Sequence, residues 1–143
     1  MTTDRLLVPV AGGPNTEFAA ETAGALARAH DARIELVTVV PDREEATVAE
    51  ARTLLDRTAP ALGAVESVRQ IVLEGSVVET IVERSSSHDV TVVGAAEGWF
   101  LRRALVGDVP EAIAREADGA VIMAKRNQAV PEALWRRLRD RFR

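Results

Sequence analysis

Hydrophobic residues gather in five short runs along the chain, each bounded by polar or turn-forming residues. An apolar run of about four to eight residues is typical of a strand that is buried on both faces of a sheet. The run that begins at Val68 alternates apolar and polar positions, which is typical of a strand near the edge of a sheet. We therefore predict strands over Leu6–Val10, Ile34–Val40, Val68–Leu73, Val90–Gly94 and Ala120–Ala124.

The segments between these strands carry the period of amphipathic helices. We predict helices over residues 16–30, 44–62 and 77–86, and a fourth from residue 109 onward. Pro60 and Gly63 mark the end of the second helix, because proline interrupts helices and glycine often follows their last turn. The expected N-caps are Asn15 or Thr16 for the first helix, Ser76 with Glu79 as a capping box for the third, and Asp108 with Glu111 for the fourth.

Strict alternation of strands and helices predicts right-handed crossovers and a parallel sheet with helices on both faces. The fold class is therefore α/β: a doubly wound, Rossmann-like sheet of five strands in the order 3-2-1-4-5. Such sheets bind ligands beyond the carboxyl ends of their strands, where the strand order reverses. The candidate loops are those that follow Val10, Val40 and Gly94.

Composition narrows the function. The chain has 143 residues, of which 47% are apolar, enough for one core. It contains no cysteine, which excludes disulfides, thiolate catalysis and cysteine zinc sites. The net charge of −4 argues against nucleic-acid binding. Because the chain has no long apolar run and its Met1 leads directly into a strand, we expect a cytoplasmic protein.

The sequence shows no catalytic constellation. Neither a dinucleotide-binding G-x-G-x-x-G pattern nor a phosphate-binding P-loop occurs. His30 and His88 stand alone, with no metal-ligand spacing around them. The three serines at 85–87 precede His88, and we interpret this polar run as a solvated turn rather than as a nucleophile with its base. We therefore expect a protein that is not an enzyme and that has no metal.

The connection after the fourth strand resembles the universal stress protein family, which carries G-x-x-G-x(9)-G-[ST] at this place. Gly94 and Gly107 match the first and third glycines at the family spacing, and Asp89 precedes the fourth strand as in the family. The opening run Leu6–Val10 and the closing run Ala120–Ala124 are also similar. The resemblance covers roughly residues 5–125. It implies a fold like that of the adenine nucleotide alpha hydrolases, and in some members a pocket for ATP.

The resemblance also shows departures from the nucleotide-binding members. Glu97 replaces the middle glycine, Asp108 replaces the serine or threonine, and Ala11 replaces an aspartate after the first strand. Asp108 is also a good helix cap, and that role alone would explain it. The resemblance assigns a remnant nucleotide pocket to eight residues: Pro9, Val10, Ala11, Val39, Gly94, Gly107, Asp108 and Val109. We expect a regulatory domain with a degenerate pocket and no cofactor; the alternative is an ATP-binding or adenine-nucleotide-binding sensor.

The last residues form a basic tail. We divide the chain into an α/β domain at residues 1–127 and an amphipathic tail helix at residues 128–143. Residues 131–143 hold five arginines against Glu132 and Asp140. Such a helix suits an anionic membrane surface, or it packs on its own domain or on a dimer mate. The resemblance implies a homodimer paired through Val121, Ile122 and Met123, and a link to membrane transporters that carry such domains as cytoplasmic appendages.

Overall fold

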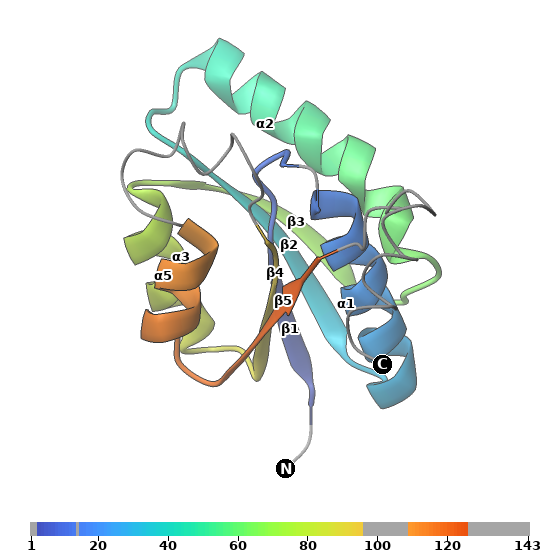
Figure 1. The fold of residues 1–143 in the computed structure, drawn as a ribbon. Helices are drawn as coiled ribbons and strands as arrows, with labels where there is room; N and C mark the ends of the chain where they lie inside the picture. The colour runs from blue at the N-terminus through green and yellow to red at the C-terminus, as the bar shows by residue number, and fades with distance from the viewer. Residues whose placement is uncertain (1–2, 14, 96–108, 126–143) are drawn as a thin grey trace, which may run out of the picture.

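The predicted sheet is present in the computed structural model of the chain, which describes residues 3–13, 15–95 and 109–125 (Figure 1). Its five strands are parallel and lie in the order β3-β2-β1-β4-β5, as predicted. The strands are β1 (Arg5–Pro9), β2 (Arg33–Val40), β3 (Val68–Glu74), β4 (Val90–Gly94) and β5 (Ala120–Ala124). The alternating strand β3 lies at one edge of the sheet, which confirms the interpretation of its pattern.

Helices cover both faces of this sheet. They are α1 (Thr16–His30), α2 (Glu45–Thr58), the 3₁₀ helix η1 (Ala59–Leu62), α3 (Val77–Ser85) and α5 (Val109–Glu116). Helices α1 and α2 lie on one face, while α3 and α5 lie on the other (Figure 1). The continuous apolar strands follow from this arrangement, because alternate side chains such as Leu6 and Leu7 enter different cores.

Two predicted boundaries differ from the structure. The helix predicted over 44–62 ends as an α-helix at Thr58 and continues as η1, which contains Pro60. Proline lacks the N–H that an α-helix needs and its ring clashes with the preceding turn, so the chain tightens there. The first strand ends at Pro9 rather than Val10, although the Val10 N–H still donates to the Val37 carbonyl at 2.7 Å.

Two predicted helix caps do not form. Ser76 occupies the N-cap position of α3 with extended dihedral angles, but its side chain makes no capping hydrogen bond. Asn15 occupies the N-cap position of α1, again without a capping bond from its side chain. Its amide is used elsewhere, as described below. Asp108, the predicted cap of the last helix, lies outside the described residues, as does the boundary predicted at residues 127 and 128.

Candidate functional site

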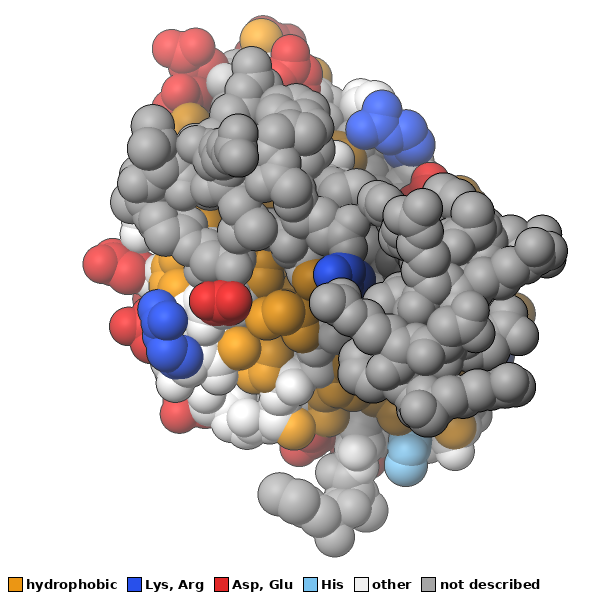
Figure 2. Space-filling view, viewed as in Figure 1, with side chains coloured by type: hydrophobic (Ala, Val, Ile, Leu, Met, Phe, Trp, Pro, Cys, Tyr) orange, Lys and Arg blue, Asp and Glu red, His pale blue; other side chains and the backbone are white. Residues whose placement is uncertain are grey.

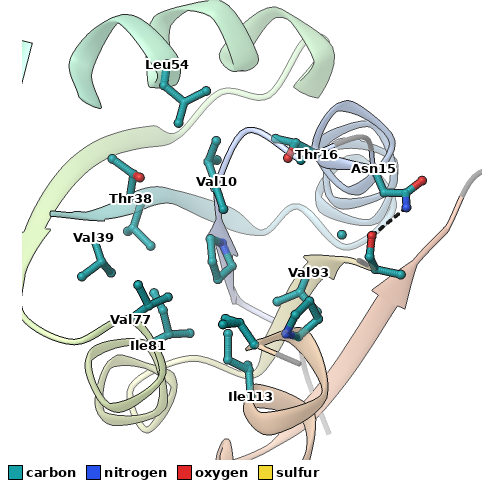
Figure 3. A pocket seen from close by; sticks show the side chains of 18 residues that line it. Val10, Asn15, Thr16, Thr38, Val39, Leu54, Val77, Ile81, Val93 and Ile113 are labelled. Carbon is teal, nitrogen blue, oxygen red and sulfur yellow. Dashed lines mark hydrogen bonds between the residues drawn. The ribbon is translucent and has the colours of Figure 1, made fainter. Parts of the chain in front are cut away.

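A cavity of about 350 Å³ opens at the carboxyl ends of β1, β2 and β4. We call it the strand-end cavity; side chains and backbone of 18 residues line it (Figure 3). It lies where the order of the parallel strands predicted a ligand site. Six of the eight residues predicted for the remnant pocket line it: Pro9, Val10, Ala11, Val39, Gly94 and Val109. The other two, Gly107 and Asp108, lie outside the described residues.

Apolar side chains form the walls of the strand-end cavity. Leu54 of α2 lines it from one side of the sheet, and Val77, Ile81 and Ile113 of α3 and α5 line it from the other (Figure 3). Val77 is the most open of these, with 41% of its surface exposed. Paired apolar walls of this kind suit a flat ligand that is enclosed on both faces.

Few polar side chains reach the strand-end cavity. Among the described lining residues no side chain is ionisable, and the polar ones are Asn15, Thr16 and Thr38. Asn15 is buried, and its Nδ2 donates to the Ala95 carbonyl at 2.7 Å. This bond ties the loop after β1 to the end of β4, so it supports the floor of the cavity.

Gly94 allows those two loops to meet. A Cβ atom at this position would lie 2.8 Å from the Asn15 carbonyl oxygen, closer than real contacts of this kind. The first glycine of the family-like pattern therefore has a packing role in this chain, independent of any ligand.

The end of β2 offers backbone groups to the cavity. The hydrogen-bonded pairing of β2 with β1 ends at Val37, whose carbonyl accepts a hydrogen bond from the Val10 N–H. Peptide groups alternate sides along a strand, so those of Val39 also face β1, whereas the Val40 carbonyl faces β3 and accepts a bond from Gly75 N at 3.0 Å. Because β1 has already ended, the N–H and C=O of Val39 face the strand-end cavity without a strand partner in the described part of the chain.

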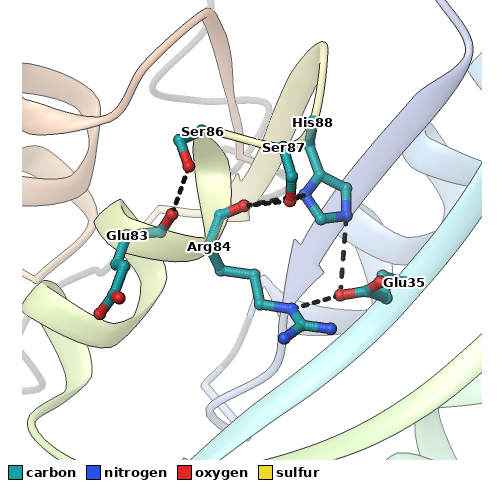
Figure 4. Close-up of polar contacts among 6 residues, drawn as sticks. All are labelled: Glu35, Glu83, Arg84, Ser86, Ser87 and His88. Atoms are coloured by element: carbon teal, nitrogen blue, oxygen red, sulfur yellow. Dashed lines mark hydrogen bonds and ion pairs between the residues drawn. The ribbon is translucent and has the colours of Figure 1, made fainter.

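A second polar group lies on β2 and the end of α3 (Figure 4). Glu35 Oε1 accepts a bond from Arg84 Nε at 2.5 Å and lies 3.6 Å from His88 Nε2. Burial raises the pKa of the Glu35 carboxyl, but the hydrogen bond and charge of Arg84, with the charges of His88 and Arg69, outweigh burial and lower that pKa below its ordinary value. The His88 side chain is 4% exposed, so the interpretation of this residue as part of a solvated turn is wrong.

The geometry around His88 is that of a structural contact. Its Nδ1 lies 2.9 Å from the Arg84 carbonyl, which only accepts hydrogen bonds, so Nδ1 carries the proton. Nδ1 therefore cannot take a proton from the Ser87 hydroxyl 3.2 Å away, and that hydroxyl itself donates to the same carbonyl at 3.0 Å. Ser85 is buried, donates to the Val82 carbonyl and accepts from Asp118 N. Among the described residues, neither Ser85 nor Ser87 has the base that a nucleophile needs.

Asp89, the landmark before β4, has a clear structural role. Its Oδ2 accepts the backbone N–H groups of Asp4 and Arg5 at 2.8 and 2.9 Å. These two bonds lower the pKa of the Asp89 carboxyl below its ordinary value. The residue thereby joins the start of β1 to the start of β4, at the end of the sheet away from the cavity.

Sequence reasoning missed the walls and one polar group of the strand-end cavity. Leu54, Val77 and Ile113 carry no local signal, because apolar helix residues are ordinary core residues. Thr38 did carry a signal, since it and Glu35 are the polar residues within the apolar run 34–40. Within residues 3–13, 15–95 and 109–125, no three acidic or histidine side chains lie close enough to hold a metal ion, and no helix is long and apolar enough to cross a membrane.

Comparisons with known proteins agree with this geometry. The sequence model of the universal stress protein family matches residues 2–125, while a search of curated protein sequences gave no match. A universal stress protein crystallised in complex with cAMP is 22% identical, with a TM-score of 0.72 over 89% of this chain and 100% of that chain. One from Archaeoglobus fulgidus in complex with dAMP is 19% identical, with a TM-score of 0.68 over 86% and 98%. Universal stress protein UspA from Lactobacillus plantarum is 21% identical, with a TM-score of 0.63 over 86% and 98%.

Proposed function

The chain belongs to the universal stress protein family, and we propose that it is a non-catalytic regulatory domain whose strand-end cavity is a degenerate nucleotide pocket. One observation carries the proposal: the cavity keeps a backbone edge and apolar walls that suit a base, yet its described lining has no ionisable side chain. Ala11 lies in that lining at the place where the family resemblance puts an aspartate.

The end of β2 supports the proposal that one half of the pocket binds a base. Val39 presents one donor and one acceptor side by side, and a purine edge has a matching pair. The cavity volume of about 350 Å³ lies within the range of small-molecule sites. Two proteins of the same fold were crystallised with cAMP and with dAMP, which supports an adenine nucleotide as the class of ligand.

The phosphate-binding half is weakened by charge. Glu97 and Asp108 belong to the connection between β4 and α5, which in nucleotide-binding members wraps the phosphates. A carboxylate about 4 Å from a phosphate charge costs up to ~4 kcal/mol at an effective dielectric near 20, and less in salt. Pro110, in the first turn of α5, also lacks the N–H that could receive a phosphate. We therefore expect ATP to bind weakly.

Calorimetric titration of ATP, with and without Mg²⁺, tests this proposal. Even a third of the Coulomb figure, about 1.4 kcal/mol, changes affinity tenfold, so Glu97→Gly combined with Asp108→Ser should bind ATP at least about tenfold more tightly than the wild type. Micromolar binding of Mg-ATP by the wild type, lost in the double variant, would instead favour the second candidate. That candidate is an ATP sensor in which Asp108 serves the bound nucleotide.

A matched pair at Val77 gives a control within the described lining. This side chain is exposed at the cavity rim, so Val77→Arg and Val77→Glu place opposite charges beside the same ligand. ATP affinity should rise with arginine and fall with glutamate, each about two- to fivefold, as for exposed charge pairs. Adenosine affinity should not respond to either change. Equal responses of ATP and adenosine would mean that the phosphates do not lie near this rim.

We also propose that the domain acts as a homodimer through β5. Val121 and Ile122 are half-buried and Met123 is 40% exposed, on a strand that ends the sheet. Figure 2 shows hydrophobic side chains gathered over β5 and α5. The basic tail at residues 131–143 supports a partner at the cytoplasmic face of a membrane, either an anionic lipid surface or a transporter.

A further inference from the structure

Thr38 is a buried polar side chain that lines the strand-end cavity. It is 7% exposed and belongs to the cavity lining. Its hydroxyl makes no hydrogen bond to any described residue, and its oxygen is not sealed in the interior as that of Thr91 is, so it is open to the cavity. Its candidate partner is therefore a molecule inside the cavity, either water or a ligand that displaces it.

Other threonines show why Thr38 is unusual. Thr22, Thr53 and Thr58 lie on helices, and each donates to the carbonyl four residues earlier. A strand offers no such carbonyl, so a buried threonine on a strand needs a partner from elsewhere. Thr91 on β4 is also buried and without a partner in the described region, but it does not line the cavity.

Thr38 and Val39 approach a ligand from different directions. Side chains alternate along β2, so Thr38 faces the α2 side of the sheet, near Leu54, while the Val39 peptide groups lie in the plane of the sheet (Figure 3). A ligand held at the Val39 edge would therefore meet the Thr38 hydroxyl with a third polar atom. A hydroxyl both donates and accepts, so it fits a ring nitrogen, an amine or a sugar hydroxyl.

We propose that Thr38 is a specificity-determining residue of the strand-end cavity, whose hydroxyl bonds a polar atom of a purine nucleoside or nucleotide on the α2 side. This inference rests on the proposed function, since it assumes that the cavity holds a base. It adds a third polar contact to the two that Val39 supplies. It also explains why a polar residue interrupts an otherwise apolar strand end.

The test is a titration of adenosine and of AMP into the full chain, followed by ¹⁵N–¹H chemical shifts, which report weak binding. Thr38→Val keeps the shape and removes the hydroxyl, and it should weaken both ligands about five- to tenfold. Because the hydroxyl bonds none of the described residues, its loss should not weaken the fold, and the thermal midpoint of unliganded Thr38→Val should equal or exceed that of the wild type. Thr38→Ser should bind within about threefold of the wild type.

Thr91→Val is the matched control, because it removes a buried strand hydroxyl that is not at the cavity. It should leave both affinities unchanged. Equal affinities of wild type and Thr38→Val would overturn the role of Thr38 while the proposed base pocket stands. A lower thermal midpoint for unliganded Thr38→Val would also overturn it, since the hydroxyl would then serve the fold. If the wild type binds neither adenosine nor AMP up to their solubility limits, the proposed function fails as well.

Discussion

At the scale of single residues, the buried polar side chains divide into those with partners and those without. Asn15 and Ser85 bridge separate elements, and the Thr58 hydroxyl donates to the Leu54 carbonyl. Thr91 has neither kind of partner among the described residues. A polar side chain left unbonded in the interior opposes folding. Removing its polar atom should therefore raise the stability of the protein, whereas removing the polar atom of a bonded side chain should lower it.

Replacing Thr91 by valine should stabilise the protein. The change removes an unbonded buried hydroxyl and keeps the side-chain shape, so the free energy of unfolding should rise by about 1 kcal/mol. Urea denaturation measures this change. Thr58→Val is the matched control, because its hydroxyl donates to the Leu54 carbonyl at 2.8 Å and its loss should lower stability by about 1 kcal/mol. A destabilised Thr91→Val would show that the hydroxyl has a partner in the folded protein.

Glu35 should make stability depend on pH in the acid range. Burial raises its pKa, but the bond and charge of Arg84, with the nearby His88 and Arg69, lower it below the ordinary value of 4.5. A lowered pKa means that the unfolded chain takes up the proton first as pH falls. The contribution of Glu35 is therefore complete above pH 4.5 and is lost as pH falls through the lower folded value.

Denaturation at several values between about pH 6 and about pH 3 tests this dependence. The difference in unfolding free energy between wild type and Glu35→Gln should shrink as the pH falls. Glu74→Gln is a control, because Glu74 pairs with Arg43 at 3.6 Å with both side chains about half exposed. Its difference from the wild type should stay small throughout. A constant difference for Glu35→Gln would contradict the lowered pKa.

Residue roles were predicted unevenly from sequence. Pro9, Val10, Ala11 and Val39 line one cavity, as the strand-end rule and the resemblance predicted. The roles of Asn15 and His88 were not predicted. Asn15 bonds Ala95, and the buried side chain of His88 lies beside Glu35, so each role depends on a residue distant in sequence. A local pattern indicates a cap or a turn at such positions, and tertiary contacts then decide how the side chain is used.

At the scale of elements, the strands were predicted closely and the helix ends less so. Buried parallel strands are marked by continuous apolar runs, which few other elements produce. Where a helix ends depends on how its last carbonyl groups are bonded, which a local pattern does not report. Here α2 ends at Thr58, and the chain continues as the 3₁₀ helix η1 up to Gly63. The edge position of β3 was also predicted, because apolar and polar residues alternate along this strand.

Gly94 should be sensitive to a single methyl group. An alanine Cβ would lie 2.8 Å from the Asn15 carbonyl oxygen, so the loop after β1 would have to move away from β4. Gly94→Ala should lower the unfolding free energy by about 1–3 kcal/mol. Gly13→Ala is the matched control in the same cavity lining, because no atom of the described residues lies within 4 Å of its added Cβ. Equal stability of the two variants would mean that the loops are not packed together in solution.

The exposed edge of β5 should pair with a second copy. Ala120 N donates to the Asp89 carbonyl and Ala124 accepts from Ala95 N, so the peptide groups of these residues face β4. By alternation, the groups of Val121 and Met123 face the open edge. Val121→Pro then removes a donor from the edge alone, and the β4 pairing should survive.

Light scattering at micromolar concentration measures this pairing. The wild type should be a dimer at low and high salt, and Val121→Pro should be a folded monomer or a weaker dimer. A monomeric wild type would remove the proposal of pairing through β5. A Val121→Pro dimer of unchanged strength would place the contact between copies elsewhere.

At the scale of the whole molecule, topology was the most predictable property. Regular alternation of strands and helices leaves few arrangements once crossovers are right-handed, and the observed order β3-β2-β1-β4-β5 is one of them. The shape of the strand-end cavity was less predictable, because Leu54, Val77 and Ile113 reach it from helices on both faces of the sheet. Their meeting is a product of packing, and no local sequence pattern reports it.

Removal of residues 131–143 should leave the domain folded and abolish the proposed binding to anionic membranes. The predicted core ends near Lys125, so the shortened chain should keep the circular dichroism spectrum and thermal midpoint of the full chain. The removed segment carries five arginines, and each basic residue near an anionic surface contributes about 1 kcal/mol to membrane binding. The full chain should therefore sediment with vesicles that contain phosphatidylserine, and the shortened chain should not.

Neutral phosphatidylcholine vesicles are the control, because they lack the negative surface charge that attracts arginine. Equal sedimentation of both chains would exclude the tail as the membrane contact. An unfolded shortened chain would mean that the tail is part of the core and that the domain does not end at residue 127.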